Sequence, residues 1–234
     1  MTYMLFTMVP TMVLSGLASF MVNSTFAKYE TIPNARGING ADAARIMLER
    51  QGVTNCTIER VEGRLSDHYD PRSRTLRLSE PVFDSTSLSA VGVACHEAGH
   101  ALQHAKEYPW LGMRSTLVPV KMLTSKASMP IIMVGFMLQY IAPVLGQWVL
   151  IAGCVLFAAA VLFAVVTLPV EWDASARAKT AMVEAGIVTE QEVIGSGRVL
   201  NAAFLTYLAA AIASILTLLY YLHRAGVLRA FMRR

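Results

Sequence analysis

The sequence predicts an α-helical membrane protein with about four transmembrane helices and a small α+β domain in water. Of its 234 residues 55% are hydrophobic and only 15% are charged, against about 25% charged in a typical soluble chain. The mean hydropathy is +0.48. Charged residues are absent from residues 1–27, 127–170 and 199–222. The chain therefore contains more apolar surface than one globular core of this size needs, gathered in three blocks.

Charge and cysteine content exclude other classes of protein. The net charge of +4 is too small to suggest nucleic acid as a partner. The three cysteines, Cys56, Cys95 and Cys154, are odd in number and have no CxxC spacing. They therefore predict neither a disulfide framework nor a cysteine-based metal site.

The three uncharged blocks divide into four predicted membrane spans, at residues 4–22, 129–145, 148–168 and 200–222. The middle block has 44 residues, about 66 Å as a helix at ~1.5 Å per residue, which is enough for two crossings of a ~30 Å layer. Pro143, Gly146 and Gln147 mark the expected turn. We thus expect a first transmembrane helix within residues 1–22, a transmembrane hairpin at 129–168, a last helix at 199–222 and a basic tail at 223–234.

The first span could instead be a signal peptide. Thr25 and Ala27 would suit a small-residue cleavage site before Lys28. The segment has no basic residues ahead of its apolar run, which favours a retained anchor.

Residues 23–128 form the predicted aqueous domain. Asn39 precedes an apolar-periodic run at residues 41–51 that Gly52 follows, which indicates a capped helix with a glycine stop. Residues 56–61, 64–69 and 75–78 are predicted as short strands of an antiparallel sheet. Ser85 is the expected cap of a long helix that runs through Lys106.

This long helix contains an HExxH motif, His96-Glu97-Ala98-Gly99-His100. Residues four apart lie on one face of a helix, so both imidazoles can reach one metal ion, and the glutamate beside the first histidine can address a water on that ion. The motif makes the aqueous domain a candidate catalytic domain of the zincin type. If the motif is a chance match, His96 and His100 are ordinary hydrogen-bonded helix residues.

A catalytic zinc normally takes three protein ligands, so a third has to be found. His104 lies about 12 Å of helical rise beyond His96, too far for the same ion on an unbroken helix. Glu171 is the best candidate, because two spans after the HExxH helix return the chain to the face that it left. Pro169 suits the first turn of a new helix, and we expect this helix and a loop at residues 169–198. The alternative is that Glu171 is a juxtamembrane surface acid.

The order of these elements resembles membrane-bound gluzincin peptidases, and four segments are similar to the YugP-type neutral zinc metallopeptidases of bacterial membranes. The similarity spans nearly the whole chain. The segments are Leu65-Ser66-Asp67-His68-Tyr69-Asp70-Pro71, Leu76-Arg77-Leu78-Ser79, Gly92-Val93-Ala94-Cys95-His96-Glu97-Ala98-Gly99-His100-Ala101-Leu102-Gln103 and Leu168-Pro169-Val170-Glu171-Trp172-Asp173-Ala174-Ser175.

The resemblance implies a zinc-dependent endopeptidase of a bacterial plasma membrane, with Zn²⁺ held by His96, His100 and Glu171 and with Glu97 as general base. Its substrate would be a protein or peptide, membrane-associated or misfolded, cleaved near the bilayer surface. Where gluzincins have an aspartate four residues after the ligand glutamate, this chain has Ser175. Either Asp173 or Ser175 could therefore orient a zinc histidine.

Further residues of the reaction are less defined by the sequence. Arg177 and His68 are the candidates for stabilising the oxyanion of the tetrahedral intermediate, and a structural role is the alternative for each. The strand at residues 75–78 could be the sheet edge on which an extended substrate adds, or an interior strand.

The sequence leaves two alternative functions and the side of the membrane on which the site lies to be considered. An intramembrane protease of the site-2 type is disfavoured, since Glu80, Asp84, Lys106 and Glu107 bracket the HExxH helix. A membrane scaffold with a structural or vestigial metal would not need Glu97 as a base. Lys and Arg residues flanking the aqueous domain favour a cytoplasmic site by the positive-inside rule, against which stand Arg224, Arg229, Arg233 and Arg234 in the tail. The sequence does not predict an oligomeric state.

Overall fold

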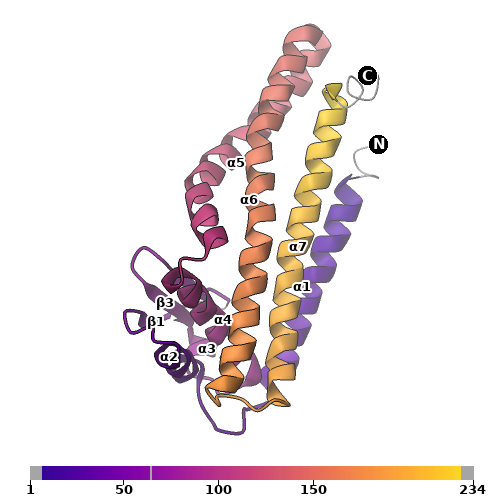
Figure 1. Cartoon of the computed structure of the whole chain (residues 1–234). Helices are drawn as coiled ribbons and strands as arrows, with labels where there is room; N and C mark the ends of the chain where they lie inside the picture. The colour runs from indigo at the N-terminus through magenta and orange to yellow at the C-terminus, as the bar shows by residue number, and fades with distance from the viewer. Residues whose placement is uncertain (1–6, 64, 228–234) are drawn as a thin grey trace. The chain divides into compact units, whose positions relative to one another are not determined.

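The computed structural model describes residues 7–63 and 65–227, and Figure 1 shows the order of their elements along the chain. The long helices are α1 (Val9–Glu30), α5 (Pro109–Ile141), α6 (Pro143–Glu184) and α7 (Glu192–Arg224). The remaining helices are α2 (Gly40–Arg50), α3 (Glu80–Phe83) and α4 (Leu88–Ala105), and the strands are β1 (Thr57–Val61), β2 (His68–Asp70) and β3 (Thr75–Ser79).

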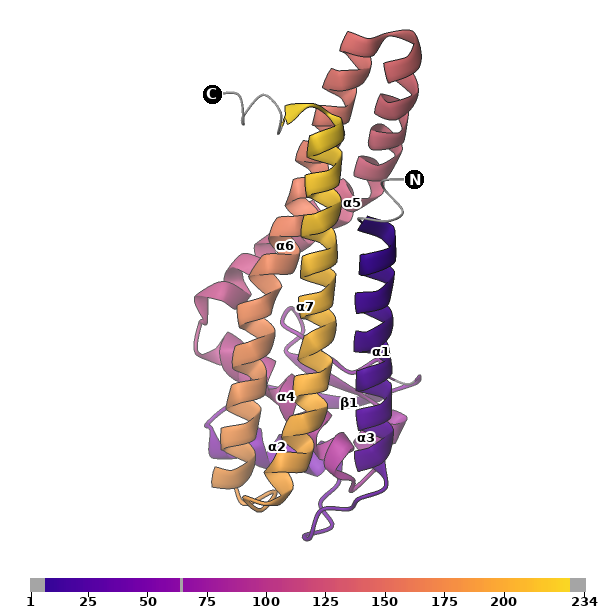
Figure 2. The same cartoon turned by 90° about the vertical axis from the view of Figure 1, so that its right-hand side faces the viewer.

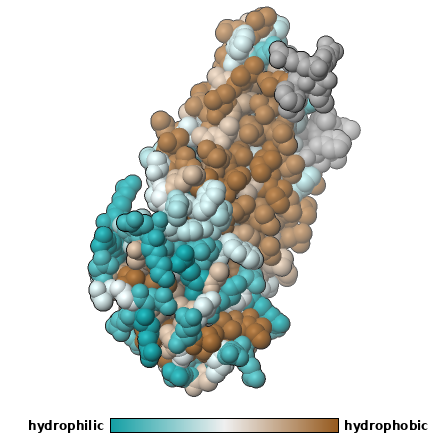
Figure 3. Space-filling model, viewed as in Figure 1, coloured by the Kyte–Doolittle hydropathy of each residue, from teal (hydrophilic) through white to brown (hydrophobic). Residues whose placement is uncertain are grey.

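The chain divides into two compact units. The first, here the apolar unit, holds residues 1–16, 113–168 and 207–234, and the second, here the polar unit, holds residues 17–112 and 169–206. Figure 3 shows hydrophobic residues over the visible face of the apolar unit, whereas hydrophilic residues gather on the polar unit.

Four helices, α1, α5, α6 and α7, are long and apolar enough to cross a membrane, as the sequence predicts. Parts of two predicted segments lie outside the described residues, namely 1–6 of the first span and 228–234 of the basic tail, which include Arg229, Arg233 and Arg234. The helices α5, α6 and α7 all extend beyond the predicted spans, since each continues into charged sequence at one end or both.

The predicted hairpin turn is one residue long and lies at Ala142, between the end of α5 and the start of α6. Pro143 is the first residue of α6, a position where its missing N–H costs nothing. Gly146 lies inside the first turn of α6, where a Cβ atom would be 2.4 Å from the backbone nitrogen of Gln139. The glycine thus allows α6 to start directly against the end of α5, and it does not itself belong to the loop.

The sheet of the polar unit is mixed, so the predicted antiparallel sheet is wrong. Its order is β1-β3-β2, with β1 parallel to β3 and β2 antiparallel to β3. The central strand contains Leu76 and Leu78, both fully buried, whereas β2 has only three residues, two of them the polar His68 and Asp70. A strand buried on both faces belongs in the middle and a short polar one at the edge. Arg64, the predicted start of the second strand, lies outside the described residues.

The two predicted helices of the polar unit are present, with one corrected cap. Asn39 caps α2 as predicted, because its side chain accepts a hydrogen bond from the Asp42 N–H. Ser87, and not Ser85, caps α4 by accepting from the Ala90 N–H at 3.2 Å. Ser85 instead accepts from the Ser87 N–H, since the separate turn α3 occupies the residues before it.

Helix α6 runs without interruption through Pro169 to Glu184, so the predicted start of a new helix at Pro169 is wrong. A proline inside a helix removes one backbone hydrogen bond and costs about 3 kcal/mol. Packing on the C-terminal side offsets this cost, because Val170, Ala174 and Ala178 are all fully buried. Figure 2 shows the C-terminal part of α6 beside the N-terminal part of α7, joined by a short loop.

Candidate metal centre

Helix α4 presents His96 and His100 on one face. The opposite face is fixed in the core of the polar unit by buried apolar residues, namely Leu88, Val91, Ala94, Cys95, Ala98 and Leu102. The ring centroids of the two histidines lie 4.8 Å apart, edge to face. The burial pattern of the helix therefore determines which face carries the HExxH histidines.

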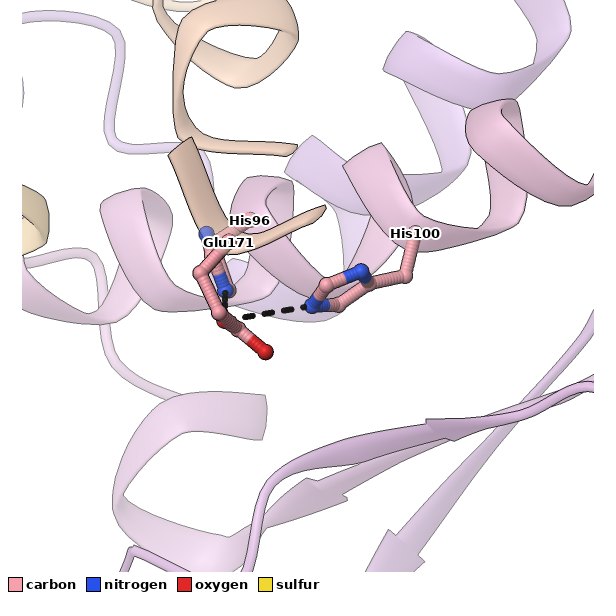
Figure 4. A group of neighbouring side chains, drawn as sticks. All are labelled: His96, His100 and Glu171. Atoms are coloured by element: carbon pink, nitrogen blue, oxygen red, sulfur yellow. Dashed lines mark hydrogen bonds and ion pairs between the residues drawn. The ribbon is translucent and has the colours of Figure 1, made fainter. Parts of the chain in front are cut away.

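Glu171 of α6 reaches the same point from a second helix, as Figure 4 shows. Its Oε2 atom lies 3.2 Å from His96 Nε2 and 3.6 Å from His100 Nε2. The side chain of Glu171 is only 1% exposed. The structure thus brings together the three residues that the sequence singles out, each from within the polar unit, with potential ligand atoms all within 4.8 Å of one another.

Glycines allow α4 to come this close to its neighbours. A Cβ atom at Gly99, inside the HExxH motif, would lie 2.6 Å from the carbonyl oxygen of Ala174 on α6. A Cβ atom at Gly92 would lie 3.2 Å from the Ser196 side chain on α7. The backbone of α4 is therefore in direct contact with α6 one turn away from Glu171.

His100 is oriented by Gln103, a residue that the sequence reasoning did not single out. Gln103 is fully buried, and its Nε2 donates to the carbonyl oxygen of Val170 and to Asp173 Oδ2, each at 2.8 Å. Both acceptors require the amide nitrogen on that side, so Oε1 faces His100 Nδ1 at 3.0 Å. Because Oε1 can only accept, Nδ1 of His100 is the donor of this hydrogen bond, and Nε2 is the ring nitrogen that faces Glu171.

Ser175 contacts the Nδ1 atom of His96, as Gln103 contacts that of His100. Its hydroxyl lies 3.1 Å from His96 Nδ1, so a proton on Nδ1 would again leave the Nε2 lone pair facing Glu171. The sequence reasoning left Asp173 and Ser175 open as groups that orient a histidine. In the structure Ser175 contacts His96 directly, whereas Asp173 acts on His100 through Gln103. One sequence feature could have indicated the role of Gln103: it is a polar residue on an apolar helix, three residues after the candidate ligand His100.

Glu97 is held beside the histidines by the edge strand β2. Its Oε2 accepts a hydrogen bond from the backbone N–H of Tyr69 at 3.0 Å. Burial raises the pKa of the Glu97 carboxyl to about 7, an effect that nearby His96 opposes and the carboxylates of Glu171 and Asp67 reinforce. A bound cation would lower this pKa again.

The oxyanion candidates Arg177 and His68, and His104, make other contacts. Arg177 donates to Asp173 at 2.5 Å and stacks over the Tyr108 ring. His68 is exposed, with Nδ1 2.8 Å from the Ser66 carbonyl oxygen. His104 Nδ1 is 2.8 Å from the Tyr69 hydroxyl. None of these three contacts involves Glu97 or Glu171.

Both histidine–glutamate pairs have the spacing of two ligands on one tetrahedral zinc ion. With Zn–N and Zn–O bonds of ~2.0–2.1 Å, neighbouring ligand atoms of a tetrahedron lie about 3.3 Å apart. The two histidine–glutamate separations, 3.2 and 3.6 Å, bracket this value. Two imidazoles and one carboxylate leave a fourth position for water, as in catalytic zinc sites.

These features define a class: a helical protein with four helices of membrane-spanning length and an HExxH helix completed by a distant glutamate. The chain belongs to the family described as "Putative neutral zinc metallopeptidase", which it matches over residues 3–226. The resemblance to the YugP-type neutral zinc metallopeptidases is thereby confirmed.

A relative in Bacillus subtilis (strain 168), "Putative membrane protease YugP", is 44% identical over 209 residues, covering 89% of this chain and 90% of the relative. No solved structure matches the chain significantly. The family indicates zinc as the metal and a protein or peptide as the substrate.

Proposed function

We propose that this protein is a membrane-embedded zinc-dependent endopeptidase of the gluzincin type, with His96, His100 and Glu171 as metal ligands. One observation carries the proposal: Glu171 Oε2 lies 3.2 and 3.6 Å from the Nε2 atoms of His96 and His100, the spacing that a shared tetrahedral ion requires. The hydrogen bonds of Ser175 and Gln103 to the Nδ1 atoms support it, because metal-binding histidines are usually fixed through their second nitrogen.

Bound zinc would supply a Lewis acid that polarises the scissile carbonyl and lowers the pKa of water. Glu97 takes the proton from the attacking water and passes it to the leaving amine. The Tyr69 N–H, which donates to Oε2, keeps the carboxyl in place between the two transfers.

The sheet offers a different substrate edge from the predicted one. The strand at residues 75–78 belongs to β3, which is paired on both sides, so it cannot accept a further strand. The edge strand β2 contacts Glu97 through Tyr69. An extended peptide would therefore lie beside β2, next to the general base that the Tyr69 N–H holds.

The substrates would be membrane-associated or misfolded proteins. Glu171 follows directly on the uncharged segment at residues 127–170, so the reaction would take place close to the bilayer surface. The Lys and Arg residues that flank the polar unit favour a cytoplasmic site in a bacterial plasma membrane.

The test is a pair of measurements on the purified full-length protein. Glu97→Gln should retain about one zinc per chain and lose peptide hydrolysis, because the amide cannot accept the proton. Glu171→Ala should lose zinc, whereas the control His104→Ala should retain it, since His104 contacts Tyr69 instead. Full hydrolysis by Glu97→Gln would favour the scaffold reading or another base, and zinc retained by Glu171→Ala would reject the ligand set.

A further inference from the structure

A groove lies between the last turns of α6 and the first turns of α7, within the polar unit. Its volume is about 660 Å³. Figure 2 shows these two helix ends side by side above their connecting loop. The groove is lined by the cations Lys179 and Arg198, by the polar side chains of Thr180 and Asn201, and by apolar residues such as Val183 and Ile194.

Lys179 is directed back along α6 toward the uncharged segment. Its Nζ atom lies 3.3 Å from Asn201 Oδ1 and 5.8 Å from the centre of the Trp172 ring, although residue 172 is two turns earlier in the helix. The stem of the side chain rests on Gly197, where a Cβ atom would be 3.2 Å from Lys179 Cδ. The ammonium of Lys179 therefore lies on the side of the groove that adjoins Trp172 and the end of the uncharged segment.

Trp172 has the position of an interfacial aromatic residue. It is 58% exposed and comes two residues after the uncharged segment ends at Val170. Its ring packs edge to face on Phe204 at 5.2 Å, and Phe204 belongs to the uncharged run at residues 199–222. Exposed tryptophan beside an apolar span is typical of the headgroup level of a bilayer.

Arg198 adds a second positive charge to the groove. Its Nη1 donates to the hydroxyl of Tyr29 at 2.9 Å, a neutral partner that fixes the guanidinium without cancelling its charge. Among the described residues that line the groove, Glu184 is the sole acid. The groove therefore combines net positive charge, hydroxyl and amide groups, apolar walls and an adjoining aromatic pair.

We propose that this groove binds the phosphate-bearing headgroup of an anionic phospholipid. Lys179 and Arg198 would contact the phosphate, Thr180 and Asn201 the polar headgroup, and the Trp172–Phe204 pair the start of the acyl chains. Basic pockets beside membrane helices recognise lipid headgroups by this combination of charge and apolar contact.

The experiment measures lipid contact, so its result does not depend on peptidase activity. The full chain, with Trp110 and Trp148 replaced by phenylalanine, is reconstituted in vesicles of phosphatidylcholine with brominated phosphatidylglycerol, or of phosphatidylglycerol with brominated phosphatidylcholine. Quenching of Trp172 by each brominated lipid gives the preference for the anionic headgroup. We expect a preference that falls by about fivefold for each cation removed in Lys179→Gln and Arg198→Gln.

Three controls make the outcome decisive. The matched variant Arg50→Gln with Lys106→Gln removes two exposed cations outside the groove and should keep the preference, and Lys179→Arg should also keep it. Quenching by brominated phosphatidylcholine reports that each variant is inserted. Equal quenching by the two lipids in the parent chain, or equal loss in the matched variant, would overturn the proposal. So would displacement of the lipid by excess inorganic phosphate, which would indicate a site for free anions.

Discussion

Gly99 lies so close to Ala174 that a Cβ atom at position 99 would be 2.6 Å from the carbonyl oxygen of Ala174 and 3.2 Å from its carbonyl carbon. Both atoms belong to the backbone of α6, so they cannot turn aside as a side chain would. The contact is three residues away from Glu171 along α6 and three away from His96 along α4. The spacing of the donors therefore depends on the absence of a side chain at residue 99.

Gly99→Ala should weaken zinc binding, although it improves helix propensity. The methyl group forces α4 and α6 apart, and overpacking of this kind costs about 1–3 kcal/mol. Zinc content and the free energy of unfolding should both fall. Gly16→Ala is the control, because a Cβ atom there meets nothing within 4 Å, and it should leave zinc unchanged. Normal zinc content in Gly99→Ala would show that the helices can separate without disturbing the donors.

Gln103→Met should lower the zinc affinity about 10- to 100-fold, the usual effect of removing a group that orients a metal-binding histidine. The thioether keeps the size of the side chain but loses the hydrogen bonds to His100 Nδ1, Val170 and Asp173. Competition with a fluorescent zinc chelator measures the change. The control Gln191→Met, at an exposed loop position, should match the parent chain, and an equal effect of both variants would contradict the orienting role.

Asp70→Asn should destabilise the polar unit in a pH-dependent way. The pKa of Asp70 is lowered to about 2 by hydrogen bonds from the Arg72 N–H, the Ser73 hydroxyl and the Arg77 guanidinium, against about 3.9 in an unfolded chain. A lowered carboxyl pKa stabilises the fold fully above about pH 4, and this stabilisation is lost as the pH falls toward 2.

Thermal unfolding in detergent should therefore show the parent chain more stable than Asp70→Asn at pH 6, with the two midpoints converging between pH 4 and 2. Glu190→Gln, at an exposed loop position, controls for the loss of one acid. A constant difference in midpoint from pH 6 to 2 would mean that the charge of Asp70 contributes nothing.

A cysteine placed at Arg72, in the β2–β3 turn, should not react with an impermeant maleimide in intact cells if the polar unit faces the cytoplasm. The partly exposed native Cys56 is first replaced by serine. Arg234→Cys is the comparison, since three spans lie between residue 72 and the tail and put the tail on the other side of the membrane, where labelling is expected. Rapid labelling at residue 72 with none at 234 would reverse the orientation.

The four spans, helices α2 and α4, and the approach of His96, His100 and Glu171 could be predicted from the sequence, because each depends on local periodicity or on counting membrane crossings. The order of the strands could not. The fully buried Leu76 and Leu78 make β3 central, but burial is set by the helices that cover the sheet. Gln103 and Gly99 were missed for the same reason: their roles depend on α6, which is distant in sequence. The prediction that a helix starts at Pro169 was wrong, since the tertiary packing of α6 outweighed the preference of proline for the first turn of a helix.

Glu171 stands 71 positions after His100 in the chain, so under the proposed ligand set the metal site is completed late in synthesis. At ~5–20 residues per second, translation needs about 4–14 s to proceed from the histidine pair to the glutamate. During this interval the HExxH helix exists without its third ligand, and two apolar segments must still enter the bilayer. With the proposed ligand set, a nascent chain therefore cannot complete its zinc site before the transmembrane hairpin has been synthesised.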